Sequence, residues 1–255
     1  MRNFKVILQY EGTRYQGWQK QESTDNTIQG KLEALLSKMA ESKVEIQGSG
    51  RTDAGVHAIG QVANFHVNTD KTPDEIMEYM NRYLPEDIAV IGIAEVSERF
   101  HSRLNAKGKT YCYRVINTKV PHVFDRRYAH VVTEKLDVEA MIKAASYLEG
   151  THDFKAFTSN RRSKKSTVRT IDSIGIERVS TPLFPKEKQD EIRFTFSGDG
   201  FLYHMVRILT GTLLEVGLHQ RKPEEMVEIL NSGLRENAGE LVPAKGLTLM
   251  EVRYS

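Results

Sequence analysis

The order of hydrophobic periodicities is the feature that most restricts the fold of this 255-residue chain. Runs that alternate between apolar and polar residues predict strands, and runs with apolar residues three and four positions apart predict helices. In the first half these runs follow the order strand, helix, strand, strand, helix, strand, with expected ranges 4–11, 27–39, 44–48, 61–67, 72–84 and 88–96. This is the order of a ferredoxin-like unit.

Local signals support the two helices of this half. Asn26 or Thr27 is a suitable N-cap for the first helix, whose apolar face is formed by Ile28, Leu32, Leu35, Leu36 and Met39. The second helix opens with Thr72, a proline and two acids, which is a typical helix start. The run 88–96 is apolar enough to predict a fully or mostly buried strand.

The second half repeats the same order at a larger scale. The expected elements are a strand at 109–117, a helix at 136–150 with Gly150 as its C-cap, strands at 167–179 and 190–198, helices at 201–217 and 223–231, and a strand at 247–254. We therefore predict an α+β protein made of two ferredoxin-like α/β halves whose mainly antiparallel sheets lie side by side. The expected domains are residues 1–104 and 105–255.

Composition limits the classes of protein that fit. Hydrophobic residues make up 39% and charged residues 27% of the chain, which is ordinary for a soluble globular protein. The apolar runs are far too short for a membrane span, and the N-terminus enters a strand pattern without a signal or transit peptide. The single cysteine, Cys112, excludes an internal disulfide and a cysteine-based zinc cage. These features favour a cytoplasmic protein.

Charge is distributed unevenly along the chain. The formal net charge is +2, but residues 101–170 carry +9 and the rest of the chain carries −7. A basic middle of this kind is typical of a surface that binds a polyanion. A solvated loop with surplus lysines explains the charge equally well.

The loop SGRTDAGVHA, at residues 49–58, presents one carboxylate, Asp53, directly behind Arg51 and Thr52. An aspartate in a turn is common. A paired-carboxylate site is disfavoured because no second acid lies between Glu45 and Asp70. Asp53 is therefore either a turn residue or a reacting group that acts without a second acid nearby in the sequence.

Other chemistries fit the sequence poorly. The GKT at 108–110 is no phosphate loop, because Arg103 stands where the pattern needs glycine and a strand follows where it needs a helix. No dinucleotide-binding glycine pattern or G-x-S-x-G elbow is present. The histidines are scattered, so we expect no functional metal.

Three further stretches favour an RNA-facing site. YEGTRYQGWQ, at 10–19, places three aromatic residues and an arginine among glycines, and Tyr111 and Tyr113 point the same way on their expected strand. Arg207 is the one cation of the apolar run FLYHMVRILTG, and a buried arginine needs an anionic partner. The alternatives are tyrosines of the core and an arginine that reaches the surface.

These segments resemble a known family. GSGRTDAGVHA, YEGTRYQGWQ, FHSRLNAKGKTYCYR, FLYHMVRILTG and AKGLTLMEVRY are similar to motifs of the bacterial tRNA pseudouridine synthase A family, and the resemblance covers nearly the whole chain. It implies isomerisation of uridine to pseudouridine in the anticodon stem-loop of tRNAs, at about positions 38–40. It also implies no metal, no nucleotide cofactor and a homodimer in which both subunits hold the tRNA.

The resemblance also implies roles for particular residues. Asp53 matches the catalytic aspartate, and Tyr111 matches the tyrosine that packs on the target base. Arg207 matches the basic residue that pairs with the aspartate, and Arg51 is similar to an arginine that helps to hold or expel the base. Two stretches depart from the family pattern: 161–169 is unusually basic, and 181–190 looks variable.

The reaction suits a site with one acid, because it exchanges a C1′–N1 bond for a C1′–C5 bond without oxidation or hydrolysis. An ionised aspartate can act as the nucleophile, and the sequence leaves open whether Asp53 attacks C1′, attacks C6 or deprotonates C2′. The sequence leaves two rival hypotheses open: a non-catalytic RNA-binding or RNA-chaperone protein, and a metal-dependent ribonuclease.

Overall fold

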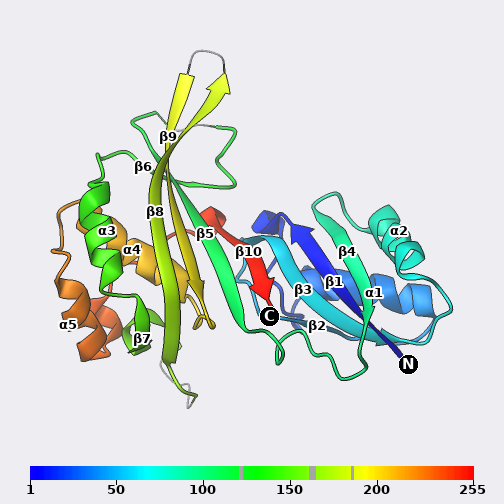
Figure 1. The fold of residues 1–255 in the computed structure, drawn as a ribbon. Helices are drawn as coiled ribbons and strands as arrows, with labels where there is room; N and C mark the ends of the chain where they lie inside the picture. Colours follow the sequence, from blue (N-terminus) through cyan, green and yellow to red (C-terminus); the bar gives the residue numbers. More distant parts are fainter. Residues whose placement is uncertain (121–122, 161–164, 185–186) are drawn as a thin grey trace. The chain divides into compact units, whose positions relative to one another are not determined.

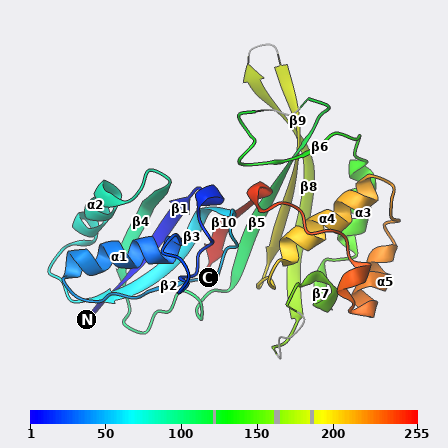
Figure 2. The same ribbon diagram turned by 180° about the vertical axis from the view of Figure 1, so that it is seen from behind.

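The computed structural model describes residues 1–120, 123–160, 165–184 and 187–255, and the side chains of 181–184 and 187–189 are not described. The chain forms two compact units. The first unit contains Met1–Lys107 and Thr248–Ser255, and the second contains Gly108–Leu247. Both are α+β, and most strand pairs are antiparallel, as predicted (Figures 1 and 2).

The first unit has the expected order of elements. They are β1 (Arg2–Tyr10), the short 3-10 helix η1 (Gly12–Arg14), α1 (Ile28–Ala40), β2 (Ile46–Gly48), β3 (His57–Val67), α2 (Pro73–Tyr83) and β4 (Ile88–Val96), followed much later by β10 (Leu247–Arg253). The spatial order is β4-β1-β3, and β2 pairs antiparallel with β3. Both helices lie on one face of this sheet (Figure 2).

Strand β10 completes the first unit although it comes last in the sequence. Thr248 and Leu249 pair in parallel with His57 and Ala58 at the start of β3. The backbone N–H of Lys107 donates to the carbonyl of Arg253 at 2.7 Å, and the Tyr254 hydroxyl donates to the carbonyl of Ser102 at 2.7 Å. The first unit is therefore built from two stretches of chain that are far apart in sequence.

Cap chemistry explains where the first two helices begin. Thr27, one of the two predicted candidates, caps α1 by accepting a hydrogen bond from the N–H of Gly30 at 3.1 Å. Thr72 and Glu75 form a capping box at the start of α2, in which each side chain accepts from the other residue's N–H.

Residues 88–96 form the predicted strand, but the prediction that this strand is fully or mostly buried is wrong. Ile88 and Val90 are buried, whereas Ile91 is 51% exposed. Among the described residues β4 stands at the end of the strand order, paired with β1. One edge and part of one face therefore remain open to solvent.

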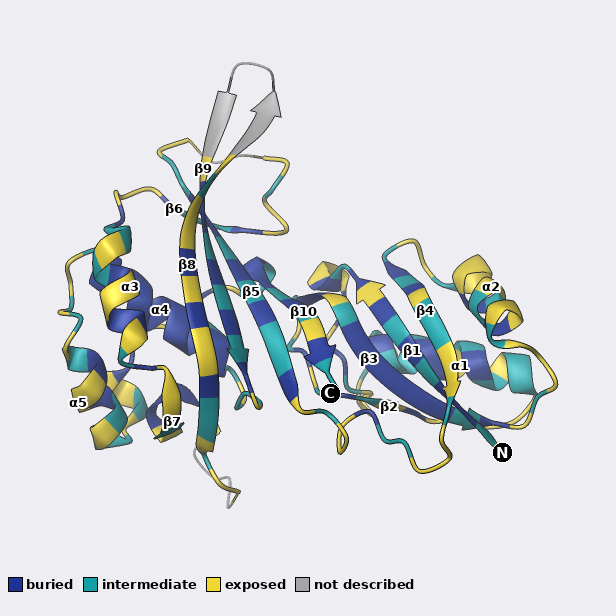
Figure 3. Ribbon diagram, in the orientation of Figure 1, coloured by how far each residue is buried: buried dark blue, intermediate teal, exposed yellow. Residues whose placement is uncertain are grey.

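The second unit contains a longer set of elements. They are β5 (Gly108–Asn117), β6 (His130–Val132), α3 (Val138–Ser146), β7 (Gly150–Asp153), β8 (Val168–Phe184), β9 (Glu187–Gly198), α4 (Met205–Gly217) and α5 (Glu225–Ser232). The strand order is β5-β9-β8-β7, with β6 parallel to β5. Helix α4 is buried along most of its length, which explains its apolar sequence (Figure 3).

Two details of the second unit differ from the prediction. Helix α3 ends at Ser146 with Tyr147 as its C-cap, and Gly150, with φ +96, begins strand β7 instead of capping the helix. The short strands β6 and β7 were not predicted, because three or four residues carry too little periodicity to be recognised. None of the helices in the described part of the chain is long and apolar enough to cross a membrane.

Candidate active site

Asp53 lies in the loop between β2 and β3, and the loop is closely anchored on both sides of it. Thr52 is buried, and its carbonyl accepts a hydrogen bond from the N–H of Trp18 at 3.0 Å. After Asp53, the N–H of Val56 donates to the Asp53 carbonyl at 3.1 Å, and Gly55 has φ +80. Asp53 itself is partly exposed, so its carboxylate sits on a fixed turn at the surface of the first unit.

Two glycines allow the segment after β1 to approach this loop. A Cβ atom on Gly12 would lie 2.0 Å from the carbonyl oxygen of Val56, and one on Gly17 would lie 2.7 Å from that of Thr52. Gly12 also donates its N–H to Nδ1 of the buried His57 at 3.0 Å. The glycines of 10–19 thus serve close backbone packing against the Asp53 loop.

The aromatic residues of 10–19 belong to the core. Tyr10, Tyr15 and Trp18 are all buried within the first unit. The rings of Tyr10 and Trp18 lie 6.2 Å apart, and a Cβ on Gly48 would lie 2.6 Å from the Trp18 indole. The suggestion that these rings face RNA is therefore wrong, and their alternative role in packing is the one observed.

Arg51 precedes Asp53 by two residues and is exposed. Its Nε donates to Oε1 of Gln19 at 3.1 Å. Arg14, the cation of the segment 10–19, forms an ion pair with Asp87 at 2.9 Å. The first unit therefore carries Arg51 and Asp53 on one loop and pairs the exposed Arg14 with Asp87.

Tyr111 and Arg207 lie in the second unit. Tyr111 is on β5 and is 8% exposed, and its ring contacts the Phe201 ring edge-on with centroids 5.3 Å apart. Arg207 is half-buried in the first turn of α4, where its Nε donates to the carbonyl of Val242 at 2.8 Å. Burial raises the pKa of Tyr113, and the positive charge of Arg207 opposes that rise.

Helix α4 begins in an unusual way just before Arg207. His204, its N-cap residue, has φ +66, a left-handed conformation that is uncommon for residues other than glycine. Its ring stacks on the Tyr203 ring with centroids 3.7 Å apart, and its Nδ1 is 2.9 Å from the Ser159 hydroxyl. The Thr158 hydroxyl donates to the carbonyl of Tyr203 at 2.9 Å. Side chains of 158–159 therefore help to fix the start of the helix that carries Arg207.

A buried ion cluster supports strand β5 near Tyr111. Glu191 on β9 has no exposed surface, and its two oxygens accept hydrogen bonds from Arg114 at 2.8 Å each. Arg193 donates to Glu191 at 2.7 Å, and Arg114 also pairs with Asp125 at 3.0 Å. Arg114 is thus committed to carboxylates of the second unit.

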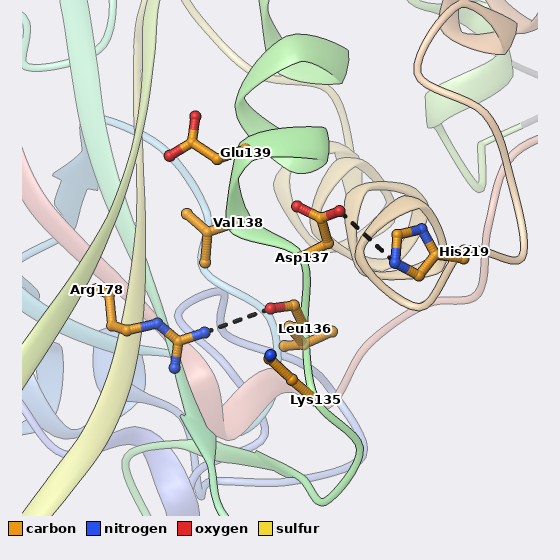
Figure 4. A pocket seen from close by; sticks show the side chains of 7 residues that line it. All are labelled: Lys135, Leu136, Asp137, Val138, Glu139, Arg178 and His219. Atoms are coloured by element: carbon orange, nitrogen blue, oxygen red, sulfur yellow. Dashed lines mark hydrogen bonds and ion pairs between the residues drawn. The ribbon is translucent and has the colours of Figure 1, made fainter.

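A hollow of about 420 Å³ lies elsewhere in the second unit (Figure 4). In it, Nε2 of His219 lies 3.6 Å from a carboxylate oxygen of Asp137, and Arg178 donates to the carbonyl of Leu136 at 3.4 Å. None of the predicted site residues lines it. Among the described residues, no group of three or more His, Cys, Asp or Glu side chains could hold a metal ion.

Sequence reasoning missed the polar side chains buried around the Asp53 loop. Ser49, His57 and Gln61 are all buried. A signal was present, because Gln61 interrupts the apolar stretch HAIGQVANFHV at a position of the expected strand. Three of the predicted site residues, Asp53, Tyr111 and Arg207, are distributed over both units of the chain.

Comparison with known proteins identifies the class. A family model described as tRNA pseudouridine synthase matches residues 6–105 and 144–255. These ranges include Arg51, Asp53 and Arg207, and they leave out 106–143 with Tyr111. The chain belongs to the tRNA pseudouridine synthase family.

Its curated relatives share its full length. The chain is 47% identical over 254 residues to "tRNA pseudouridine synthase A" of Bacillus sp. (strain KSM-64), and 48% identical over 254 residues to "tRNA pseudouridine synthase A 1" of Clostridium tetani, with 100% of each chain covered in both cases. It is 45% identical over 255 residues to the synthase A of Acetivibrio thermocellus, again with full coverage. A solved Cas6 chain in a substrate-mimic complex, covering 97% of this chain and 98% of its own, has a TM-score of 0.21 and 10% identity and supports no conclusion.

Proposed function

We propose that this chain is an isomerase that converts uridine to pseudouridine in the anticodon stem-loop of tRNAs, at about positions 38–40. The observation that supports this most is Asp53, a carboxylate held on a closely anchored loop in a chain of the pseudouridine synthase family. Family membership disfavours the metal-dependent ribonuclease.

Asp53 is the proposed catalytic group. The C1′–N1 bond of the uridine breaks, a C1′–C5 bond forms, C5 loses its proton, and N1 ends the reaction protonated. An ionised carboxylate serves as nucleophile at C1′ or C6, or as base at C2′. All three routes require the same fixed carboxylate beside the sugar and base, and none needs a cofactor.

Tyr111, Arg207 and Arg51 are the proposed substrate-binding residues. The target base must leave its stack at a cost of a few kcal/mol, and stacking on the Tyr111 ring returns about 1–3 kcal/mol. In this proposal Arg207 is the basic partner of the Asp53 carboxylate, because a guanidinium forms charge-assisted hydrogen bonds with carboxylates. Its hydrogen bond to the Val242 carbonyl fixes the direction of its side chain. Arg51 holds the flipped base or the adjacent phosphate.

The proposed partner is tRNA, bound by a homodimer in the cytoplasm. Phosphate contacts from the basic segment 101–170 supply most of the affinity, and such contacts weaken as salt rises. Analytical ultracentrifugation of the chain alone tests the dimer. A monomer at micromolar concentration would contradict that part of the proposal and leave the reaction unaffected.

The first test is the substitution Asp53→Asn, assayed on unmodified tRNA transcripts without added metal. We expect the wild-type chain to form pseudouridine at about positions 38–40, and Asp53→Asn to form none, because the amide is neutral and a poor nucleophile. Affinity for tRNA should stay within a few-fold. Pseudouridine mapping at each uridine provides the readout.

A matched control is Asp70→Asn, which removes one exposed carboxylate from the same unit and should leave the activity unchanged. If Asp53→Asn still forms pseudouridine, Asp53 is not the catalytic group. If the wild-type chain binds tRNA but forms no pseudouridine in any RNA tested, the non-catalytic RNA-binding hypothesis replaces the enzyme.

A further inference from the structure

A chain of hydrogen bonds between buried side chains connects strands β1 and β3 to the Asp53 loop. Ser49 Oγ donates to Gln61 Oε1 at 2.7 Å, and Gln61 Nε2 donates to the carbonyl of Gly50 at 3.1 Å and to Tyr10 Oη at 3.3 Å. Tyr10 Oη lies 2.8 Å from Thr52 Oγ1. We call Tyr10, Ser49, Thr52 and Gln61 the loop network.

The directions of these hydrogen bonds follow from chemistry. The Gly50 carbonyl only accepts, so the Gln61 amide must turn its NH₂ group toward Gly50 and Tyr10, and its oxygen toward Ser49. Tyr10 Oη accepts from Gln61, and in the pair of Tyr10 and Thr52 either hydroxyl can donate to the other. Burial raises the pKa of Tyr10 to about 12, so the phenol remains a donor at neutral pH. Every donor of the Gln61 amide is used.

The network holds the stretch that leads directly to Asp53. Side chains of the sheet, Gln61 and Tyr10, form hydrogen bonds to Ser49, Gly50 and Thr52. Three of the four residues before Asp53 are therefore held. Gln61 is 0% exposed. Buried polar groups cost free energy unless all are paired, and apolar side chains would fill this space with less risk to stability.

We infer that Gln61 and Tyr10 are positioning residues, which act through Ser49, Gly50 and Thr52 to aim the Asp53 carboxylate. This inference rests on the proposed function, because it assigns the network a role in the same reaction. A displacement of about 1 Å at a reacting group can cost roughly 100-fold in rate. Fixing the backbone immediately before Asp53 is therefore a sufficient reason for four buried polar side chains.

The chain contains matched controls for both residues. Asn64 is also a fully buried amide on β3, but its side chain bonds to Asn3, Phe100 and Ser102, away from the loop. Tyr254 donates its hydroxyl proton to the Ser102 carbonyl in the same unit. Asn64→Leu and Tyr254→Phe therefore remove similar hydrogen bonds without affecting the loop network.

The experiment measures kcat, tRNA affinity and thermal stability for Tyr10→Phe and Gln61→Met beside Tyr254→Phe and Asn64→Leu. We expect Tyr10→Phe to lower kcat by roughly 10-fold or more, with tRNA affinity within about two-fold of wild type. Tyr254→Phe and Asn64→Leu should lose stability but keep kcat. Amide hydrogen exchange at residues 49–56 should be faster than in wild type in Tyr10→Phe and Gln61→Met, and unchanged in Tyr254→Phe and Asn64→Leu.

Thr52 provides a rescue test that does not depend on the larger substitutions. Thr52→Val removes the hydroxyl and should lower kcat as Tyr10→Phe does. Thr52→Ser keeps the hydroxyl and should have the wild-type kcat. The double variant with Tyr10→Phe and Thr52→Val should be no slower than either single variant, since both remove the same bond.

The outcomes separate this inference from the proposed function. If the wild-type chain forms no pseudouridine, the proposed function fails and the inference fails with it. If the wild-type chain is active but Tyr10→Phe and Thr52→Val keep the wild-type kcat, the network is only structural. The same holds if Asn64→Leu lowers kcat as much as Gln61→Met at equal loss of stability.

Discussion

Glu191 is a buried carboxylate whose ionised form depends on two arginines. Burial alone would raise its pKa, but the hydrogen bonds and charges of Arg114 and Arg193 outweigh that effect and lower the pKa below its usual value. A carboxylate with a lowered pKa in the folded state stabilises the fold above the unfolded-state pKa. That contribution is lost as the pH falls through the lower, folded-state value.

We expect Glu191→Gln to destabilise the protein by about 3 kcal/mol at pH 7, because it leaves Arg114 and Arg193 without their shared anion. It should also reduce the fall in stability below about pH 4.5, the ordinary glutamate value. Urea unfolding at pH 7 and at several pH values below 5 measures both effects. The exposed pair of Lys143 and Glu224 provides the control: Glu224→Gln should change stability little. Equal effects of the two variants would contradict the expectation.

At the scale of elements, the Asp53 loop depends on how closely the segment after β1 can approach it. Gly17 has φ +87, and a Cβ atom there would lie 2.7 Å from the Thr52 carbonyl oxygen. That carbonyl accepts the hydrogen bond of Trp18. The position thus combines a left-handed backbone with an approach too close for any side chain.

We expect Gly17→Ala to displace Thr52 and lower kcat by roughly 10-fold or more, as misplacement of a reacting group does. Gly92 on β4 offers a control, because a Cβ there would meet only Ile7 side-chain atoms at 3.5 Å, an ordinary contact. Steady-state kinetics of Gly17→Ala and Gly92→Ala measure the difference. A Gly17→Ala enzyme with the wild-type kcat would show that the loop tolerates displacement.

At the scale of the whole molecule, charge separates along the chain into a basic stretch at 101–170 and an acidic remainder. Part of the basic stretch lies on the surface. Arg126 and Arg127 are exposed, and Phe124, which precedes them in the sequence, is 70% exposed. Arg161, Arg162 and Lys164 lie outside the described residues. The salt dependence of RNA binding tests the stretch as a whole.

Neutralising Arg161, Arg162, Lys164 and Lys165 to Gln should flatten the dependence of tRNA affinity on salt. The slope of log K against log salt should fall by roughly 0.7–0.9 for each RNA phosphate that these side chains neutralise in the wild-type complex. The control replaces four lysines of the first unit by Gln, namely Lys31, Lys38, Lys43 and Lys71. An unchanged slope in the first variant would mean that 161–165 is a solvated loop.

Local chemistry made much of the fold predictable from the sequence. Periodicity and cap residues act within a few positions, so α1, α2 and the order of the first unit could be predicted, including the cap at Thr27. The burial of β4 could not, because it depends on which strands become its neighbours. The end of α3 was missed because a glycine can begin a strand, as Gly150 does, as well as follow the end of a helix.

The candidate site was predictable only in part. Asp53 stands out in the sequence as a lone acid between glycines. The residue types of Tyr10, Tyr15 and Trp18 do not show whether their rings pack in the core, as they do, or face RNA. The loop network depends on residues 51 positions apart, Tyr10 and Gln61. Contacts of that range are decided by the packing of strands β1 and β3, which no local pattern encodes.

The late position of β10 in the sequence has a consequence for synthesis of the protein. A ribosome completes the entire second unit before it adds Thr248 and Leu249, the partners of His57 and Ala58 at the start of β3. Until then the strand that follows the Asp53 loop is paired with β1 but lacks β10 along those residues. We therefore expect the nascent chain to stay inactive toward RNA until translation has passed Leu249, so that no partly made enzyme modifies tRNA beside the ribosome.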